Sequence, residues 1–306
     1  MANKKKRGID IHGLVVLDKP LALSSNHALQ QVKRLFNARK AGHTGTLDPL
    51  ASGALVICFG RATKIAEHIT SMQKCYSVVA QLGQETTTGD SEGEVTRQAD
   101  VKQHHIEGFQ ALIPQFLGDI EQVPPMYSAL KKDGVPLYKL ARQGQQVERG
   151  SRLVKIHDIM LGEMTNDTVE MTVKCSKGTY IRTLVEDMGR ALGCYAHVKL
   201  LRRLSVGDFG TLYPMVTMQE MESVLQHHKN IESLVLPIET AYSGYPSKTL
   251  NEGFVQMLQQ GIGLQLEQTH SLKYLRIFDT QGVLRGLAQL EQGKAVKFNQ
   301  FFGTRG

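Results

Sequence analysis

The sequence lacks the features that mark exported, membrane-spanning or disulfide-stabilised proteins. No stretch approaches the roughly 20 consecutive apolar residues that cross a bilayer, and the basic residues 4–7 precede a strand-like segment instead of the hydrophobic region of a signal peptide. The cysteines lie far apart, with no C-x-x-C pair: Cys58, Cys75, Cys175 and Cys194. We therefore expect a cytoplasmic protein with reduced thiols and no membrane partner, in which residues 4–7 form a solvated tail.

Signatures of common nucleotide, hydrolase and metal chemistries are also missing. The chain contains no G-x-x-x-x-G-K-[ST], no strand-linked G-x-G-x-x-G, no G-x-S-x-G and no H-E-x-x-H. The pairs His104-His105 and His227-His228 lack the i, i+4 spacing of helical zinc ligands, and we interpret them as surface residues. Nucleotide hydrolysis, Rossmann redox chemistry, serine hydrolysis and zinc proteolysis lose their usual support, and we expect no cofactor and no metal.

The length and charge of the chain set broad bounds. Its 306 residues suffice for one large or two ordinary domains. Lysine and arginine outnumber aspartate and glutamate by 36 to 29, which gives a net charge of +7 and favours an anionic partner. This balance alone does not prove nucleic-acid binding.

Hydrophobic periodicity predicts a mixed α+β body followed by a small β domain. Strands are predicted at residues 13–17, 54–59, 76–82 and 169–175, helices at 25–36, 106–117 and 181–192, and a polar loop at 85–100. From about residue 250 the pattern changes to a short helix ending near 261 and strands at 274–278 and 283–290.

Asp48 is chemically isolated within its segment. It is the single carboxylate between Asp18 and Glu67, against seven lysines and arginines. Such surroundings are expected to keep it ionised, and Pro49 disfavours helical geometry at Asp48. Asp-Pro also commonly opens a turn, and spacing alone favours that structural role over a catalytic one.

A second candidate lies where the strand ending at Cys175 leads into a helix. Tyr180 and Arg182 fall in the first turn of this helix, where the helix dipole favours anions. The alternative for Arg182 is a surface pair with Glu186 one turn later, worth a few tenths of a kcal/mol. Without further information the surface pair is favoured.

Several blocks, in order along the chain, resemble the TruB-type tRNA pseudouridine synthases, the stand-alone bacterial enzymes that act on uridine 55 of the T loop. The blocks are Asp18-Lys19-Pro20, AGHTGTLDPLASG at residues 41–53, Lys74-Cys75-Tyr76, PPMYSALK at 124–131, CSKGTYIR at 175–182 and AHVKLLRRL at 196–204. They extend from near the start of the chain to residue 204 and are more specific together than any single motif.

The resemblance implies a role for each matching residue. Asp48 would be the essential catalytic aspartate, Tyr76 would stack on the flipped uracil, and Arg182 would pair with Asp48. The remaining implied positions are His43 at the RNA or in the gap left by the base, Tyr180 and Leu201 lining the uridine pocket, and Lys19 and Pro20 supporting the site.

The resemblance also implies an architecture. The fold would be α+β, with a mixed, largely antiparallel sheet flanked by helices in a catalytic domain at residues 1–249 and a β-barrel-like PUA domain at 250–306. Residues 119–150, which carry five cations and two tyrosines, would be an RNA-contacting insertion; their composition alone also suits an ordinary exposed arm.

The implied partner is tRNA, bound by a monomer without guide RNA or cofactor. Two alternatives stay open: a non-catalytic RNA-binding or RNA-folding protein on the same scaffold, and a guide-RNA-dependent synthase.

Overall fold

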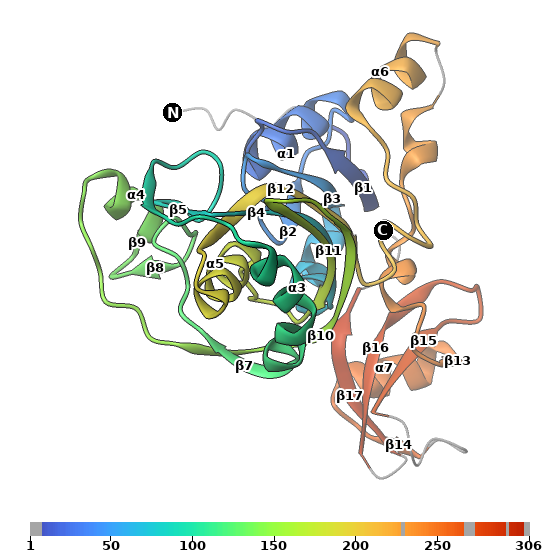
Figure 1. The fold of residues 1–306 in the computed structure, drawn as a ribbon. Coiled ribbons are helices and arrows are strands. Elements are labelled where there is room, and N and C mark those ends of the chain that lie inside the picture. Colours follow the sequence, from blue (N-terminus) through green and yellow to red (C-terminus); the bar gives the residue numbers. More distant parts are fainter. Residues whose placement is uncertain (1–7, 228–229, 266–272, 292–293, 303–306) are drawn as a thin grey trace.

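The fold is built on an eight-stranded and a five-stranded β-sheet (Figure 1). It is taken from a computed structural model that describes residues 8–227, 230–265, 273–291 and 294–302. The basic run at residues 4–7 lies outside the described residues. In the described part, no helix is long and apolar enough to cross a membrane.

The larger sheet is mixed and largely antiparallel, as expected. Its strands run in the order β1-β3-β12-β4-β11-β10-β7, with β2 also paired to β3. β12 runs parallel to β3 and antiparallel to β4, and the other neighbours are antiparallel. The bounds are β1 Gly13–Lys19, β2 Ala41–Thr44, β3 Ala51–Phe59, β4 Lys74–Leu82, β7 Gly118–Gln122, β10 Arg152–Met164, β11 Thr168–Cys175 and β12 Ala196–Val206.

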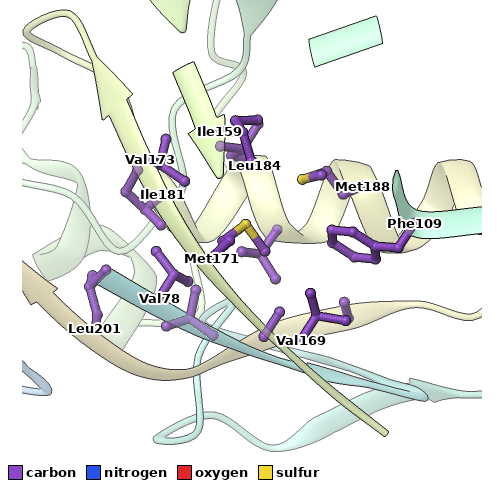
Figure 2. Close-up of a cluster of buried hydrophobic side chains, with 14 of the residues drawn as sticks. Val78, Phe109, Ile159, Val169, Met171, Val173, Ile181, Leu184, Met188 and Leu201 are labelled. Carbon is purple, nitrogen blue, oxygen red and sulfur yellow. The ribbon is translucent and has the colours of Figure 1, made fainter. Parts of the chain in front are cut away.

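Helix α5 (Ile181–Leu192) packs its apolar stripe on the centre of this sheet (Figure 2). Leu184 and Met188 are fully buried, together with Val169 and Val173 of β11. This confirms the helix predicted at residues 181–192. It packs here because its apolar residues recur every three to four positions and meet the buried face of a strand, whose apolar residues alternate. The start of α5 is thereby fixed beside the carboxyl end of β11.

The strands β1 and β3 are buried on both faces. Val15 and Leu55 contribute to a core shared with α1 (Ser25–Leu35) and α6 (Met218–Gln226). Val16 and Val56 contribute to a second core that contains residues of the five-stranded sheet. Burial on both faces explains why each of these two strands appears in the sequence as a continuous apolar run and not as an alternation of apolar and polar residues.

One local prediction is wrong, and another is confirmed only in part. The expected loop at residues 85–100 contains a hairpin of β5 (Gln84–Thr86) and β6 (Val95–Gln98); β6 is exposed throughout and so has no apolar alternation to reveal it. The expected helix at 106–117 is α3 (Gln103–Leu112) followed by a 3-10 turn, Ile113–Phe116, because Pro114 cannot continue an α-helix.

An irregular segment leaves the sheet after the edge strand β7 and returns at β10. It contains the short pair β8 (Lys131–Lys132) and β9 (Val135–Pro136) and the helix α4 (Leu137–Arg142). In Figure 1 it extends away from the larger sheet on the side opposite the C-terminal strands.

The C-terminal part forms the second sheet, in the order β13-β15-β16-β17-β14. The bounds are β13 Ser247–Thr249, α7 Glu252–Gln259, β14 Leu264–Gln265, β15 Tyr274–Phe278, β16 Leu284–Glu291 and β17 Lys294–Phe301. β13 precedes residue 250, the expected boundary, yet pairs with β15. Within the described ranges no pairing joins β13 to β14, so the expected barrel-like form is not confirmed.

The remaining short elements are three 3-10 helices and one α-helix. They are the 3-10 helices η1 Gly60–Ile65, η3 Ile231–Leu234 and η4 Ile238–Tyr242, with α2 at Ala66–Ser71. Ala62 and Ile65 pack with Leu287 and Phe302 of the C-terminal part. The second sheet is therefore docked on the larger one through a shared apolar core.

Candidate active site

The loop that carries Asp48 joins β2 to β3 and is anchored beside Asp48. The buried hydroxyl of Ser25 donates to the Leu47 carbonyl at 2.8 Å and accepts from the Leu47 amide at 2.7 Å. The Asp48 carbonyl accepts from the Ala51 amide at 3.1 Å. Asp48 therefore does open a turn, as Asp-Pro predicts, and this backbone role leaves its carboxylate available for other contacts.

Arg182 forms an ion pair with that carboxylate. Nη2 of Arg182 lies 2.8 Å from Oδ2 of Asp48, and the two side chains are 4% and 36% exposed. The expected pairing is present, and the alternative of a surface pair with Glu186 is wrong because Arg182 is buried. The carboxylate is thus held by a buried cation and keeps an accessible side.

Asp90, which the sequence analysis did not identify, is a second carboxylate on Arg182. Its Oδ2 lies 3.3 Å from Nη1 of Arg182, and both side chains are buried. The guanidinium also donates to the carbonyls of Thr88 at 2.8 Å and Tyr127 at 2.7 Å. Asp90 lies within the polar segment predicted as a loop, where nothing in its spacing set it apart from its polar neighbours.

Burial raises the pKa of Asp48 above its ordinary value. Arg182 acts in the opposite direction and favours the charged carboxylate, while Asp90 adds to the rise and Lys19 opposes it. The cation-rich sequence around Asp48 suggested a carboxylate that simply stays ionised. That expectation omitted desolvation and the charge of Asp90, both of which the fold introduces.

Tyr76 and Leu201 lie on neighbouring strands, β4 and β12. Leu201 is buried in the same cluster as Leu47 and Leu50, the apolar residues that flank Asp48, and Tyr76 packs against this cluster. Figure 2 shows Leu201 beside Val78 at the edge of the cluster. Burial raises the pKa of the Tyr76 hydroxyl. The aromatic ring and the leucine are thus brought to the Asp48 loop.

Tyr180 is the N-cap residue of α5, so it immediately precedes the helix and, contrary to the prediction, does not lie within its first turn. Its backbone is held by the buried side chain of Gln122, at the end of β7. The Gln122 amide donates to the Tyr180 carbonyl at 3.0 Å and accepts from the Tyr180 amide at 2.7 Å. Gln122 had no distinguishing sequence pattern, since its role depends on two segments distant in the chain.

His43 lies on β2, opposite Ile57 of β3. Burial, and then the positive charge of Arg203, lower the pKa of its imidazole, which favours the neutral ring. Its buried Nδ1 has no hydrogen-bond partner among the described residues. This histidine therefore has an unused polar atom close to the loop of Asp48.

Lys19 and Pro20 are placed differently. Lys19 is fully buried at the end of β1, and its Nζ donates to the carbonyls of Pro20 at 2.8 Å and Leu23 at 2.6 Å. Burial lowers its pKa to about 8, and the charge of Asp48 acts against this shift. Pro20 is exposed. Lys19 thus fixes the turn after β1 and adds positive charge near Asp48.

The segment between β7 and β10 reaches the site through Tyr127, whose carbonyl accepts from Arg182. Farther along, four of its cations are exposed: Lys131, Lys132, Lys139 and Arg142. Arg142 lies 5.8 Å from the centre of the Tyr138 ring. One end of this segment is therefore tied to the ion pair, and the other presents positive charge to solvent.

Comparison with known proteins gives matches along nearly the whole chain. Residues 33–181 match the TruB family pseudouridylate synthase N-terminal domain, and residues 182–243 match the tRNA pseudouridylate synthase B C-terminal domain. The chain is 44% identical to tRNA pseudouridine synthase B of Nitrosococcus oceani, over 99% of this chain and 100% of that protein. It is also 44% identical to that of Stutzerimonas stutzeri, over 95% and 96%.

Solved structures share the fold at lower identity. A structure described as a Cbf5-Nop10-Gar1 complex has a TM-score of 0.73 and 24% identity, covering 95% of this chain and 85% of that chain. An archaeal box H/ACA sRNP Nop10-Cbf5 complex has a TM-score of 0.70 and 23% identity, over 99% and 93%. These likenesses show the fold alone, whereas the near full-length sequence matches show that the chain belongs to the TruB family of pseudouridylate synthases.

Proposed function

We propose that this chain is a tRNA pseudouridine synthase that isomerises uridine 55 of the T loop. The observation that carries the proposal is the partly accessible Asp48 carboxylate held 2.8 Å from buried Arg182. Relatives with 44% identity over almost the full chain are named tRNA pseudouridine synthase B, which supports tRNA as the substrate.

The reaction breaks the bond between ribose C1′ and uracil N1 and forms a bond between C1′ and C5. The C5 proton is lost and N1 gains a proton, so atoms balance without an oxidant, a reductant or a nucleotide. Asp48 acts as the ionised carboxylate, at C1′, at C6 or on the C2′ proton. Arg182 supports each of these routes because a nearby cation favours the charged form.

The target base must leave its stack to reach Asp48. Flipping costs a few kcal/mol, and stacking on an aromatic ring returns about 1–3 kcal/mol. We assign that stacking to Tyr76, the walls of the uridine pocket to Tyr180 and Leu201, and the RNA contact or vacated gap to His43. Lys19 and Pro20 support the site from the turn after β1.

Three ranges of the chain have different proposed roles. We assign residues 1–249 to catalysis, 119–150 within them to an RNA-contacting insertion, and 250–306 to a PUA-like RNA-binding domain. The exposed cations of the insertion suit RNA phosphates. We expect a cytoplasmic monomer that works without guide RNA or cofactor.

The two alternatives differ in outcome. A non-catalytic RNA-binding protein has no use for a paired, accessible carboxylate, and a guide-dependent synthase makes no product on free tRNA. The test is to incubate the pure protein with an unmodified tRNA transcript, without cofactor or metal, and to map pseudouridine by chemical stopping. We expect product at position 55 from the intact protein and none from Asp48→Ala. No product from the intact protein would overturn the proposal.

A further inference from the structure

Arg203 is a buried cation beside the loop that carries Asp48. It is 1% exposed, and within the described ranges it forms no ion pair with a carboxylate. A buried charge without a counter-ion is costly. Hydrogen bonds from the guanidinium must therefore offset the cost of burying its charge.

The side chain of Arg203 joins the two ends of the Asp48 loop. Its Nε donates to the Ala54 carbonyl at 2.7 Å, and its Nη2 donates to the Gly45 carbonyl at 3.0 Å. Gly45 follows β2 and Ala54 lies in β3. One guanidinium thus closes the base of the loop, with Asp48 between the two anchors.

The backbone of Arg203 is fixed to the same loop and to Tyr76. It pairs with Gly53 of β3 on one side and with Tyr76 of β4 on the other. Gly53 has φ of 98°, and a Cβ there would come within 2.2 Å of the Arg203 carbonyl. Only glycine permits this close approach without a shift.

Arg203 and Tyr76 project from the same face of the sheet, because they are directly opposed on antiparallel strands. The positive charge of Arg203 acts to lower the pKa of the Tyr76 hydroxyl, against the burial that raises it. A single buried residue therefore holds the loop of Asp48 and is paired with Tyr76.

We infer that Arg203 is a positioning residue that fixes the Asp48 loop and the Tyr76 ring relative to each other. The inference rests on the proposed function, in which the flipped uridine lies against both residues. It assigns Arg203 no contact with RNA. The planar fork of arginine can bind several acceptors at once, which the single ammonium of lysine cannot reproduce.

The first test compares Arg203→Lys and Arg203→Gln with the wild type on an unmodified tRNA transcript. We expect the single-turnover rate constant to fall about 100-fold, because a small misplacement of reacting groups has that effect, and the Kd for tRNA to change less than about threefold, because no phosphate contact is lost. We use two variants because either one could fail to fold, and the other then still tests the inference.

Met221→Ala is the matched control. Met221 is also fully buried, in the core shared by α1, α6 and β1, and α6 bears no residue assigned to the site. We expect Met221→Ala to lower the thermal stability, because a buried large-to-small change leaves a cavity, and to leave the single-turnover rate constant unchanged.

The second test does not depend on activity. Tyrosine labelled with ¹³C at Cζ gives a resonance for Tyr76, assigned with Tyr76→Phe, that reports on the electrostatic surroundings of its hydroxyl. We expect this resonance to move in folded Arg203→Lys. A folded variant with the wild-type rate constant, or with the Tyr76 resonance unmoved, overturns the inference. If the wild type itself makes no product, the proposed function fails and the resonance alone decides the role of Arg203.

Discussion

The hydroxyl of Ser25 forms two hydrogen bonds with Leu47, donating to its carbonyl at 2.8 Å and accepting from its amide at 2.7 Å. Ser25 is 2% exposed and begins α1, whereas Leu47 immediately precedes Asp48. The first helix and the loop of Asp48 are thereby joined at the residue next to the carboxylate.

Ser25→Ala is expected to weaken both stability and activity. It leaves two buried backbone groups of Leu47 without partners, which costs about 1–3 kcal/mol of unfolding free energy, and it loosens the loop of Asp48, which should lower kcat about 10- to 100-fold. Urea unfolding and single-turnover assays measure the two effects. Ser24→Ala is the control, since Ser24 caps α1 by accepting from the His27 amide. It should cost about 1 kcal/mol and leave kcat unchanged; an equal loss of kcat in both variants would contradict this explanation.

Arg182→Met is expected to move the pH dependence of the reaction. In the proposed reaction Asp48 must be ionised, so we expect activity to be lost as pH falls through its pKa, and Arg182 acts to lower that pKa. Without the guanidinium the pKa rises further, and the acidic limb of the kcat profile should shift to higher pH. Breaking a buried pair also costs about 3–5 kcal/mol, so the profile is recorded on protein shown to be folded by circular dichroism. A limb that stays in place would show that Arg182 does not control the ionisation of Asp48.

Glu186 is expected to make stability depend on pH. Burial raises its pKa from 4.5 to about 7; Arg190 opposes the rise, and Glu85 and Asp187 add to it. Because the folded state binds the Glu186 proton more tightly than the unfolded state does, protonated Glu186 stabilises the fold. This stabilisation is fully present below about pH 4.5 and is lost as pH rises through about 7. Glu186→Gln should therefore raise the unfolding free energy by about 1–2 kcal/mol at pH 8, allowing for partial solvent exposure, and by much less at pH 4.5. Urea unfolding at both pH values measures this, and the exposed Glu163→Gln should give equal changes at both.

The exposed cations between β7 and β10 are expected to contribute to tRNA affinity. Lys131→Gln, Lys132→Gln, Lys139→Gln and Arg142→Gln, made singly, should each weaken binding and reduce the slope of log K against log salt by about one where a phosphate contact is lost. Filter binding across a salt series measures the slope. Arg39→Gln is the control, because Arg39 is an exposed cation already paired with Asp10 at 2.7 Å. Unchanged slopes in all four variants would remove the RNA-contacting role assigned to this segment.

The sequence predicted the regular elements well where one face of an element is buried. α5 and β11 repeat their apolar residues at the helical and strand periods, so their existence followed from pattern alone. The pair β5–β6 was missed because β6 is exposed throughout and shows no apolar alternation. The helix predicted at 106–117 was too long because its apolar period continues past Pro114, where the α-helix has already ended. Whether the C-terminal sheet closes into a barrel depends on pairing between its strands, which periodicity does not report.

For the site, the sequence by itself determined the residue types and the family blocks that contain Asp48, Tyr76 and Arg182. It could not determine that Asp90 shares Arg182 with Asp48, that Gln122 holds Tyr180, or that Arg203 lies between the loop and Tyr76. These relationships join segments far apart in the chain, and only the tertiary structure brings them together. The same burial also raises the pKa of Asp48 against the influence of its cationic sequence neighbours, because desolvation depends on what surrounds a group in space and not on what precedes it in the chain.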